Sequence, residues 1–254
     1  MKIDASSWPI HITDWLENDL IENSTVIKDL LITNGVVVCH SGPILSDYKL
    51  SELGNTIGNT DPQYSSDDKP IYIRSDYTDI AHFDSDFELL KDSVLGTVEL
   101  SWHHDKALSK HSAGYHILAC DYNEDTNYTS YLDCTKILDK VTTFERDLFR
   151  KLSVLLKLSE DSNYANDYLR RASNIPFDAK KEKSLVTTHP LSRIESIFWC
   201  PEFFEDFPKN PSITESIQSF IEYLYSLITP NMVYNHNWKN GDLILADQIL
   251  TSHK

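Results

Sequence analysis

Short runs of apolar and β-branched residues, separated by longer polar stretches, constrain the fold of this chain most. Such runs have the usual length of buried strands. They are Val36–Cys39, Tyr115–Cys120, Leu185–Thr188 and Ile194–Trp199. Near the end of the sequence, Val233–Trp238 and Asp242–Ser252 alternate around Asn240-Gly241, which indicates a hairpin. The sequence therefore predicts a core of β-strands.

Segments with apolar residues at helical spacing lie between these predicted strands. Ser46–Ile57 has this spacing, and Ser46 is a suitable N-cap. The same period predicts two helices between Ser130 and Leu158, broken near Thr142-Thr143, and further helices at Asp161–Arg171 and Ser212–Ile228. The fold class is therefore mainly β, with helical insertions.

Composition and charge narrow the class of protein. With 254 residues, 41% hydrophobic and 24% charged, the chain reads as a globular protein, and we expect a single domain over residues 1–254. It has no apolar run near the roughly 20 residues that span a bilayer, and no signal-peptide core, so we expect a cytoplasmic protein. The net charge of −16 disfavours a nucleic acid or a membrane as partner. Four cysteines without a CxxC pair are expected to be buried free thiols: Cys39, Cys120, Cys134 and Cys200.

Residues 103–105 hold a candidate metal site. His103 and Asp105 are two residues apart, so at the end of an extended strand their side chains point to the same side and can bind one ion. A distant third histidine would complete the facial triad of non-haem iron(II) oxygenases, in which coordination positions stay open. Pairs of this kind also arise by chance, and His82-Phe83-Asp84 is a second one. The pair alone therefore does not identify the site.

Longer motifs favour the His103/Asp105 pair over His82/Asp84 as the metal site. Four stretches follow one another in the order VIKDLLITNGVVVCHSGPILSDYKLSELGNTIG, LGTVELSWHHDKAL, EDTNYTSYLDCTKIL and NWKNGDLILADQILTSHK. The second contains Trp-His-X-Asp, and the fourth contains Trp-X-X-Gly-Asp and a histidine near its end. Together with TTHPLSRIES, these stretches resemble the taurine dioxygenase (TauD/TfdA) family, over nearly the whole chain from Val26 to Lys254.

The resemblance implies a fold, a reaction and roles for single residues. The fold would be a distorted double-stranded β-helix, a jelly-roll or cupin-like core. His103, Asp105 and His253 would bind iron(II), and Thr126 would contact the co-substrate 2-oxoglutarate. The enzyme would use O2 to hydroxylate an unactivated C–H bond of a small molecule, with succinate and CO2 as co-products.

Two more residues are candidates for substrate contacts. Glu99 lies shortly before His103, near the place where family members bind substrate, and a carboxylate there would suit an amine; the alternative is a solvent-facing strand residue. His189 precedes Pro190 and is either a pocket residue or part of an ordinary turn. The sequence does not name the substrate, and it leaves open whether the chain forms a homo-oligomer.

One family feature is not found. Family members anchor the distal carboxylate of 2-oxoglutarate with an arginine beyond the distal histidine, whereas this sequence stops at Lys254. We expect a truncated product without its last strand, because a lost strand exposes a sheet edge. Alternatively, Arg193 or Arg74 substitutes, or 2-oxoglutarate is not bound. Two rival functions stay open: a catalytically inactive homologue that acts as a binding or structural protein, and a zinc hydrolase with the same three ligands.

Overall fold

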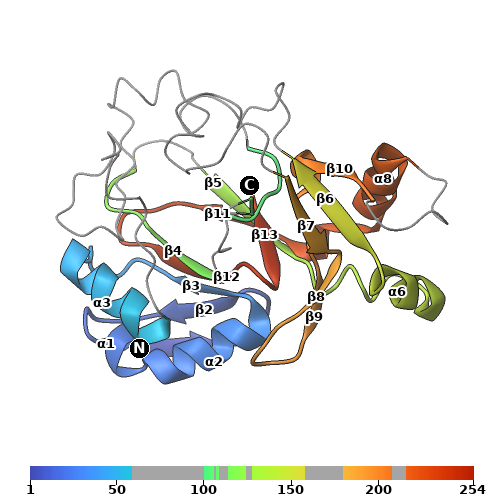
Figure 1. Cartoon of the computed structure of the whole chain (residues 1–254). Coiled ribbons are helices and arrows are strands. Elements are labelled where there is room, and N and C mark those ends of the chain that lie inside the picture. The colour runs from blue at the N-terminus through green and yellow to red at the C-terminus, as the bar shows by residue number, and fades with distance from the viewer. Residues whose placement is uncertain (59–99, 106, 109–113, 124–127, 158–179, 208–215) are drawn as a thin grey trace, which may run out of the picture. The chain divides into compact units, whose positions relative to one another are not determined.

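The computed structural model describes residues 1–58, 100–105, 107–108, 114–123, 128–157, 180–207 and 216–254 (Figure 1). The chain divides into two compact units. Unit 1 comprises Met1–Thr97, Gly114–Thr129 and Asn235–Asp247, and unit 2 comprises Val98–Ala113, Ser130–Tyr234 and Gln248–Lys254. Each unit joins segments that are far apart in the sequence. The expectation of a single domain stays a prediction.

Unit 1 contains a five-stranded sheet of order β1-β2-β3-β12-β4. Its strands are β1 (Lys2–Asp4), β2 (Ile10–Thr13), β3 (Val36–Cys39), β12 (Leu243–Asp247) and β4 (Tyr115–Ala119). Strand β3 is parallel to β2 and antiparallel to β12, where Val37 lies opposite Leu245. Every residue of β3 is fully buried, which confirms the buried strand predicted there.

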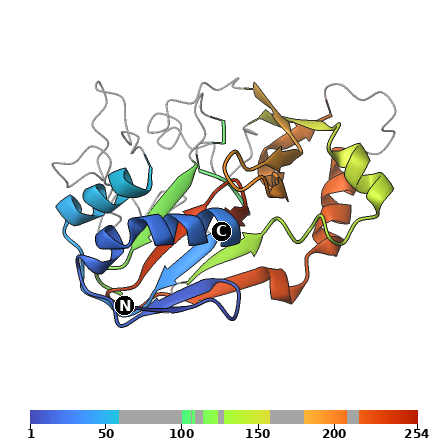
Figure 2. The same ribbon diagram turned by 90° about the horizontal axis from the view of Figure 1, so that it is seen from below.

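In the described part of unit 1, the helices are α1 (Asp19–Glu22), α2 (Ser24–Asn34) and α3 (Asp47–Ile57). Ile27 and Leu31 of α2 and Leu53 of α3 share one apolar cluster with the inner residues of β3 and β12. Figure 2 shows α2 lying alongside these strands. Helix α3 confirms the prediction for Ser46–Ile57, because the Ser46 hydroxyl accepts a hydrogen bond from the amide of Lys49 (3.4 Å) and caps the helix.

Unit 2 contains a three-stranded sheet of order β10-β6-β7 and a two-stranded sheet, β8-β9. Their strands are β6 (Ser153–Lys157), β7 (Lys180–Ser184), β8 (Val186–Thr188), β9 (Glu195–Ile197) and β10 (Phe204–Asp206). Strands β8 and β9 confirm the two strands predicted on either side of Pro190. Among the residues of this unit that the structure describes, the helices are α6 (Thr143–Phe149), α8 (Ile217–Leu227) and the 3-10 turns Pro201–Phe203 and Pro230–Met232.

A further three-stranded sheet has the order β11-β5-β13. Its strands are β11 (Val233–Asn237), β5 (Tyr128–Asp133) and β13 (Thr251–His253). Strand β13 is antiparallel to β5, and His253 lies opposite Tyr131. This register places the last strand of the chain, with its histidine, beside a fully buried residue.

The two helices predicted between Ser130 and Leu158 are wrong for most of that range. The structure has strand β5, then turns, then α6, then strand β6. Buried residues occupy both faces of the end of β5, so its apolar pattern carries no strand period. The predicted break at Thr142-Thr143 is the start of α6, where Thr142 and Glu145 form a capping box.

The predicted C-terminal hairpin is also wrong, although its turn is present. Strand β12 pairs with β3 and β4, while β11 lies next to β5. Gly241 has a φ of 79° and fits the turn, because an added Cβ would lie 2.1 Å from the carbonyl oxygen of Gly42. The apolar run after the turn divides at Gln248 into two strands in different sheets.

The mainly β fold class is confirmed. The cysteines are free, as predicted; Cys39, Cys134 and Cys200 are buried and Cys120 is half-buried. Among the described residues, no helix is long and apolar enough to cross a membrane. The helix predicted at Asp161–Arg171 and the first residues of the one predicted at Ser212–Ile228 lie outside the described residues.

Candidate metal centre

Two of the predicted ligands are direct neighbours across a backbone bridge. The amide of His103 donates to the carbonyl of His253 (2.9 Å), and the amide of His253 donates to the carbonyl of His103 (3.1 Å). On its other edge, β13 is joined to β5, and residues Ser130 and Lys254 exchange two further hydrogen bonds of 2.8 and 3.0 Å. The backbone therefore fixes the spacing of the two histidines.

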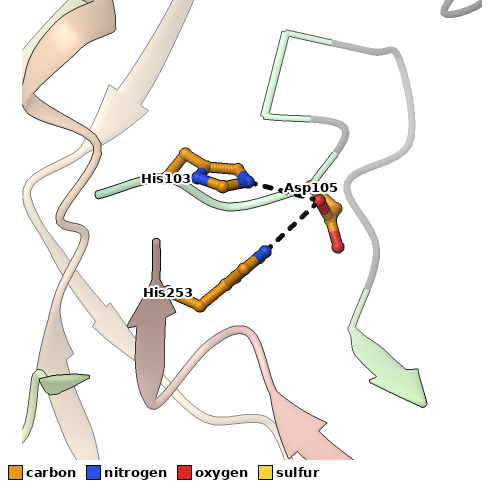
Figure 3. Close-up of side chains that lie close together, drawn as sticks. All are labelled: His103, Asp105 and His253. Atoms are coloured by element: carbon orange, nitrogen blue, oxygen red, sulfur yellow. Dashed lines mark ion pairs between the residues drawn. The ribbon is translucent and has the colours of Figure 1, made fainter. Parts of the chain in front are cut away.

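Asp105 completes a cluster with the two imidazoles (Figure 3). The Nε2 atoms of His103 and His253 lie 3.7 and 3.6 Å from Oδ1 of Asp105. The two ring centroids are 4.1 Å apart, and the ring planes are inclined by 50°. One donor atom from each residue lies within 4.8 Å of the other two, a spacing that suits a single metal ion.

The hydrogen bonds of His103 fit metal binding. Its Nδ1 lies 2.8 Å from the carbonyl oxygen of Ser101. Because a carbonyl oxygen can only accept, Nδ1 carries a proton, and Nε2 on the side of Asp105 is the nitrogen that would bind a metal. Two imidazole nitrogens and one carboxylate form the donor set that suits iron(II). The residues present therefore fit this metal.

Gln248 binds the short segment that links the ligands His103 and Asp105. Its carbonyl oxygen accepts from Nδ1 of His104 (2.5 Å), and its side-chain Oε1 accepts from the amide of Asp105 (2.5 Å). The His104 ring is buried and packs on Phe198, with centroids 4.6 Å apart. Burial lowers the pKa of His104 to about 4, so the ring is neutral at pH 7. His104 thus faces away from the cluster.

The cluster is enclosed on the histidine side and open at Asp105. The side chains of His103 and His253 are 10 and 11% exposed, whereas that of Asp105 is 44% exposed. The fully buried Tyr131 ring is stacked 6.1 Å from that of His253. Burial raises the pKa of Tyr131, and the nearby charge of Asp105 raises it further, so this phenol keeps its proton. An exchangeable ligand would therefore approach from the side of Asp105.

The other residues singled out in the sequence lie elsewhere. His189 is buried at the end of β8, where its Nδ1 accepts from the amides of Leu191 and Ser192 (3.3 and 3.0 Å). Arg193 is exposed in the same turn, with a φ of 62°. Glu99, Thr126, Arg74 and the His82-Phe83-Asp84 pair lie outside the described residues.

Sequence reasoning missed Gln248 and Ser101, which position the cluster. Their contacts run through a turn and through a backbone carbonyl, and neither produces a recognisable pattern in a sequence. It also missed Lys183, whose positive charge contributes to the lowered pKa of His104. The sequence did place Lys181 and Lys183 two residues apart, on the same face of a strand. Lysines usually face solvent, however, so this spacing did not indicate a buried position.

Comparison with known proteins gives the fold and the family. A structure of AAD-2 in complex with Mn(II) and N-oxalylglycine is 17% identical with a TM-score of 0.73, covering 100% of this chain and 91% of that chain. A Burkholderia xenovorans protein proposed to be an alpha-ketoglutarate-dependent 2,4-D dioxygenase is 18% identical with a TM-score of 0.69, covering 100% and 88%. A taurine dioxygenase from the same organism is 14% identical with a TM-score of 0.65, covering 91% and 72%. The search of curated proteins gives no match.

At such identities, these structures show that the chain has their fold, which confirms the predicted jelly-roll. The family model described as taurine catabolism dioxygenase TauD, TfdA family matches residues 2–254. Because this match spans nearly the whole sequence, the chain belongs to the TauD, TfdA family and is an iron(II)- and 2-oxoglutarate-dependent dioxygenase.

Proposed function

We propose that this dioxygenase hydroxylates an unactivated C–H bond of a small molecule, with His103, Asp105 and His253 as its metal ligands. One observation carries the ligand assignment. Three donor atoms from two distant segments lie within 4.8 Å of one another, and both segments carry the motifs that resemble the family's ligand motifs. Among the described residues, no other group of this kind is found.

The chemistry that iron(II) and 2-oxoglutarate supply when bound is the oxidative decarboxylation of 2-oxoglutarate to succinate and CO2, coupled to hydroxylation of the substrate by O2. His103 and His253 hold one edge of the site at a spacing set by their backbone bridge. Asp105 fills the third ligand position with a carboxylate. A halide would need that position, so its occupation favours hydroxylation over halogenation.

Three further residues are part of this proposal. We infer from the family motif that Thr126 contacts 2-oxoglutarate. Glu99 and His189 are proposed as substrate contacts, Glu99 for a substrate that carries an amine. For His189, Nδ1 already accepts hydrogen bonds from the turn that follows β8, so a contact with substrate would use the other ring nitrogen, Nε2.

An anaerobic titration with iron(II) and 2-oxoglutarate tests the ligand set. We expect the weak visible charge-transfer band of the ternary complex in the wild-type protein and its loss in His103→Ala, Asp105→Ala and His253→Ala. The matched controls are His82→Ala and Asp84→Ala, which disrupt the other His-X-Asp pair of the chain and should leave the band intact.

The outcomes separate the rival functions. Absence of the band from folded wild-type protein contradicts the dioxygenase assignment of this site and favours an inactive homologue. Hydrolytic activity with zinc, without consumption of O2 or formation of succinate when iron is present, favours the hydrolase. Loss of the band in the control variants would move the ligands to the other pair.

A further inference from the structure

Two half-buried histidines of unit 1 form a hydrogen-bonded pair. Nδ1 of His11 lies 2.8 Å from Nε2 of His40. His11 alternates along β2 with Ile10 and Ile12, which belong to the apolar cluster that includes α2 and α3, so its side chain points to the opposite face of the sheet. His40 directly follows β3, and its amide donates to the carbonyl of Ile12 (2.9 Å). The pair therefore joins β2 to the end of β3.

The two imidazole rings lie edge to edge and nearly in one plane. Their planes are inclined by 20°, and their centroids are 5.0 Å apart. This separation is close to the sum of the 2.8 Å distance and the two ring radii, so both nitrogens lie near the line that joins the centroids. A proton on that line is donated by one nitrogen and accepted by the lone pair of the other. The bond therefore accommodates one proton.

This single proton limits the charge of the pair. An imidazole is charged only when both of its nitrogens carry protons. If His11 and His40 were both charged, two N–H groups would face each other at 2.8 Å and neither would have an acceptor there. The intact pair can thus carry one positive charge but not two. In an unfolded chain, by contrast, histidines bind their protons independently below about pH 6.5.

Charged and titratable groups of neighbouring segments surround the pair. They are Asp4 on β1, the ion pair of Lys2 with Asp14, His236 on β11, and Asp242 before β12. Asp4 lies opposite His11 in the register of β1 and β2. The His236 ring is buried, 6.0 Å from the ring of His40, and its Nε2 lies 3.1 Å from Oδ2 of Asp242. Carboxylates therefore lie on both sides of the histidines.

Burial outweighs these carboxylates. It lowers the pKa of His11, and the charge of His40 lowers it further, against the opposing effect of Asp4. Burial likewise lowers the pKa of His236 more than Asp242 raises it. Because the folded pKa values lie below the unfolded ones, the unfolded chain binds more protons in acid. Stability is therefore fully present above about pH 6.5 and is lost as the pH falls.

We propose that His11 and His40 form an acid-sensitive switch that holds β2 on the end of β3. With one proton between the rings, the hydrogen bond is intact. When the second ring takes up a proton from water, the N–H···N bond breaks and the two cations separate, which loosens β1 and β2 from the sheet. This proposal is independent of the proposed function.

The alternative is an ordinary pair of buried histidines whose titrations are independent. In that case each histidine makes its own contribution to the dependence of stability on pH. The shared proton predicts a contribution that belongs to the pair, because removing either ring allows the other to be charged without a clash. The two explanations therefore differ in whether the effects of two substitutions add.

Amide side chains of matched reach provide the test. His11→Asn places an amide near the position of Nδ1, and His40→Gln places one near the position of Nε2. An amide accepts from a charged imidazole and donates to a neutral one, so each variant keeps a hydrogen bond without a shared proton. The double variant completes the set. The matched control is His116→Gln, which removes a half-buried histidine of β4 in the same unit.

Urea unfolding of the full chain is measured at pH 7.5 and pH 5. The pair should lower the folding equilibrium constant of the wild type by about 30-fold between these values, since the unfolded chain binds one more proton. Either single variant should abolish this loss, and the double variant should abolish no more. His116→Gln should retain it. Contributions of other groups are common to all five proteins and cancel in the comparison.

Additive effects would overturn the proposal. If each single variant removes about half of the loss and the double variant removes the sum, the histidines titrate independently. If the loss is the same in all five proteins, the pair does not respond to acid.

Hydrogen exchange of the wild type gives a reading that does not depend on the folding of a variant. The amide of His40, which is bonded to Ile12, reports the junction of β2 and β3. After correction for the intrinsic exchange rate, opening of this junction should be about 30-fold more frequent at pH 5 than at pH 7.5. Equal opening at both pH values would contradict the switch.

Discussion

His104 shows how a polar residue between two metal ligands is used when it cannot be a ligand. Its ring is buried, its Nδ1 is bonded to the carbonyl of Gln248, and its other face packs on Phe198. The neutral imidazole donates a hydrogen bond through Nδ1 and packs its ring face against an aromatic side chain. The cost of charging it is the reason for its lowered pKa.

This lowered pKa predicts how stability depends on pH. The folded pKa is about 4 and the unfolded value is 6.5, so between these values the unfolded chain binds the extra proton and stability falls as the pH falls. From pH 7.5 to pH 5, His104 should cost the metal-free protein about 2 kcal/mol. Urea unfolding of wild type and His104→Asn, which keeps a donor toward Gln248, should show this part of the slope only in wild type. Parallel pH curves would contradict it.

Gln248 gives a second prediction for a single residue. Gln248→Met keeps the volume but leaves the amide of Asp105 without its side-chain acceptor. Residues that orient ligands typically contribute about 10- to 100-fold to metal affinity, so manganese(II) should bind more weakly by about that factor. Calorimetry measures this, with Gln218→Met on the exposed face of α8 as control. Unchanged affinity in folded Gln248→Met would show that the backbone alone places Asp105.

Among the helices and strands, those in which apolar residues recur at one clear spacing, or form one short run, were predictable from the sequence. Helix α3 has an apolar face and a capping serine, and β3 is a short β-branched run after a turn. Prediction failed at β5, where buried residues on both faces leave no strand period to read. The prediction of a C-terminal hairpin was wrong for a different reason. The residues Asn240-Gly241 specify a turn but not which strands pair, and β12 pairs with the buried strand β3.

A pair of identical substitutions tests the role of β3. Val37 is fully buried in the central strand of unit 1, whereas Val26 is 46% exposed on α2. Val37→Ala should lower the free energy of unfolding by about 2 kcal/mol, because a cavity opens between α2 and the sheet. Val26→Ala should change it little or raise it slightly, since alanine favours helix. Urea unfolding compares them; equal effects would mean that β3 is not the core of this unit.

At the scale of the whole molecule, the metal centre was predictable because its ligand types and their order follow a family pattern. His103, Asp105 and His253 come together in the structure as expected. The half-buried position of Lys183 on β7 was not predictable, because a strand this short gives no indication of which face is buried. Whether a polar side chain contacts the metal ligands depends on which distant segments the fold places next to it.

Metal binding should be linked to the stability of the folded chain. At a free manganese(II) concentration of about 100 times Kd, the folded state gains about 3 kcal/mol, and Tm should rise by several degrees. 2-Oxoglutarate should raise Tm further only when the metal is present. In His253→Ala, whose ring is lost from the end of β13, both shifts should disappear. A shift by 2-oxoglutarate alone would indicate binding away from the metal.

The backbone bridge between His103 and His253 has a consequence for how the site is assembled. Main-chain hydrogen bonds hold the backbones of two of the three ligands at a fixed spacing without any metal. The conformational entropy lost on loading is therefore confined mostly to one exposed carboxylate, that of Asp105. Of the three ligands, the side chain of Asp105 is therefore the one that we expect to become more ordered when the ion binds.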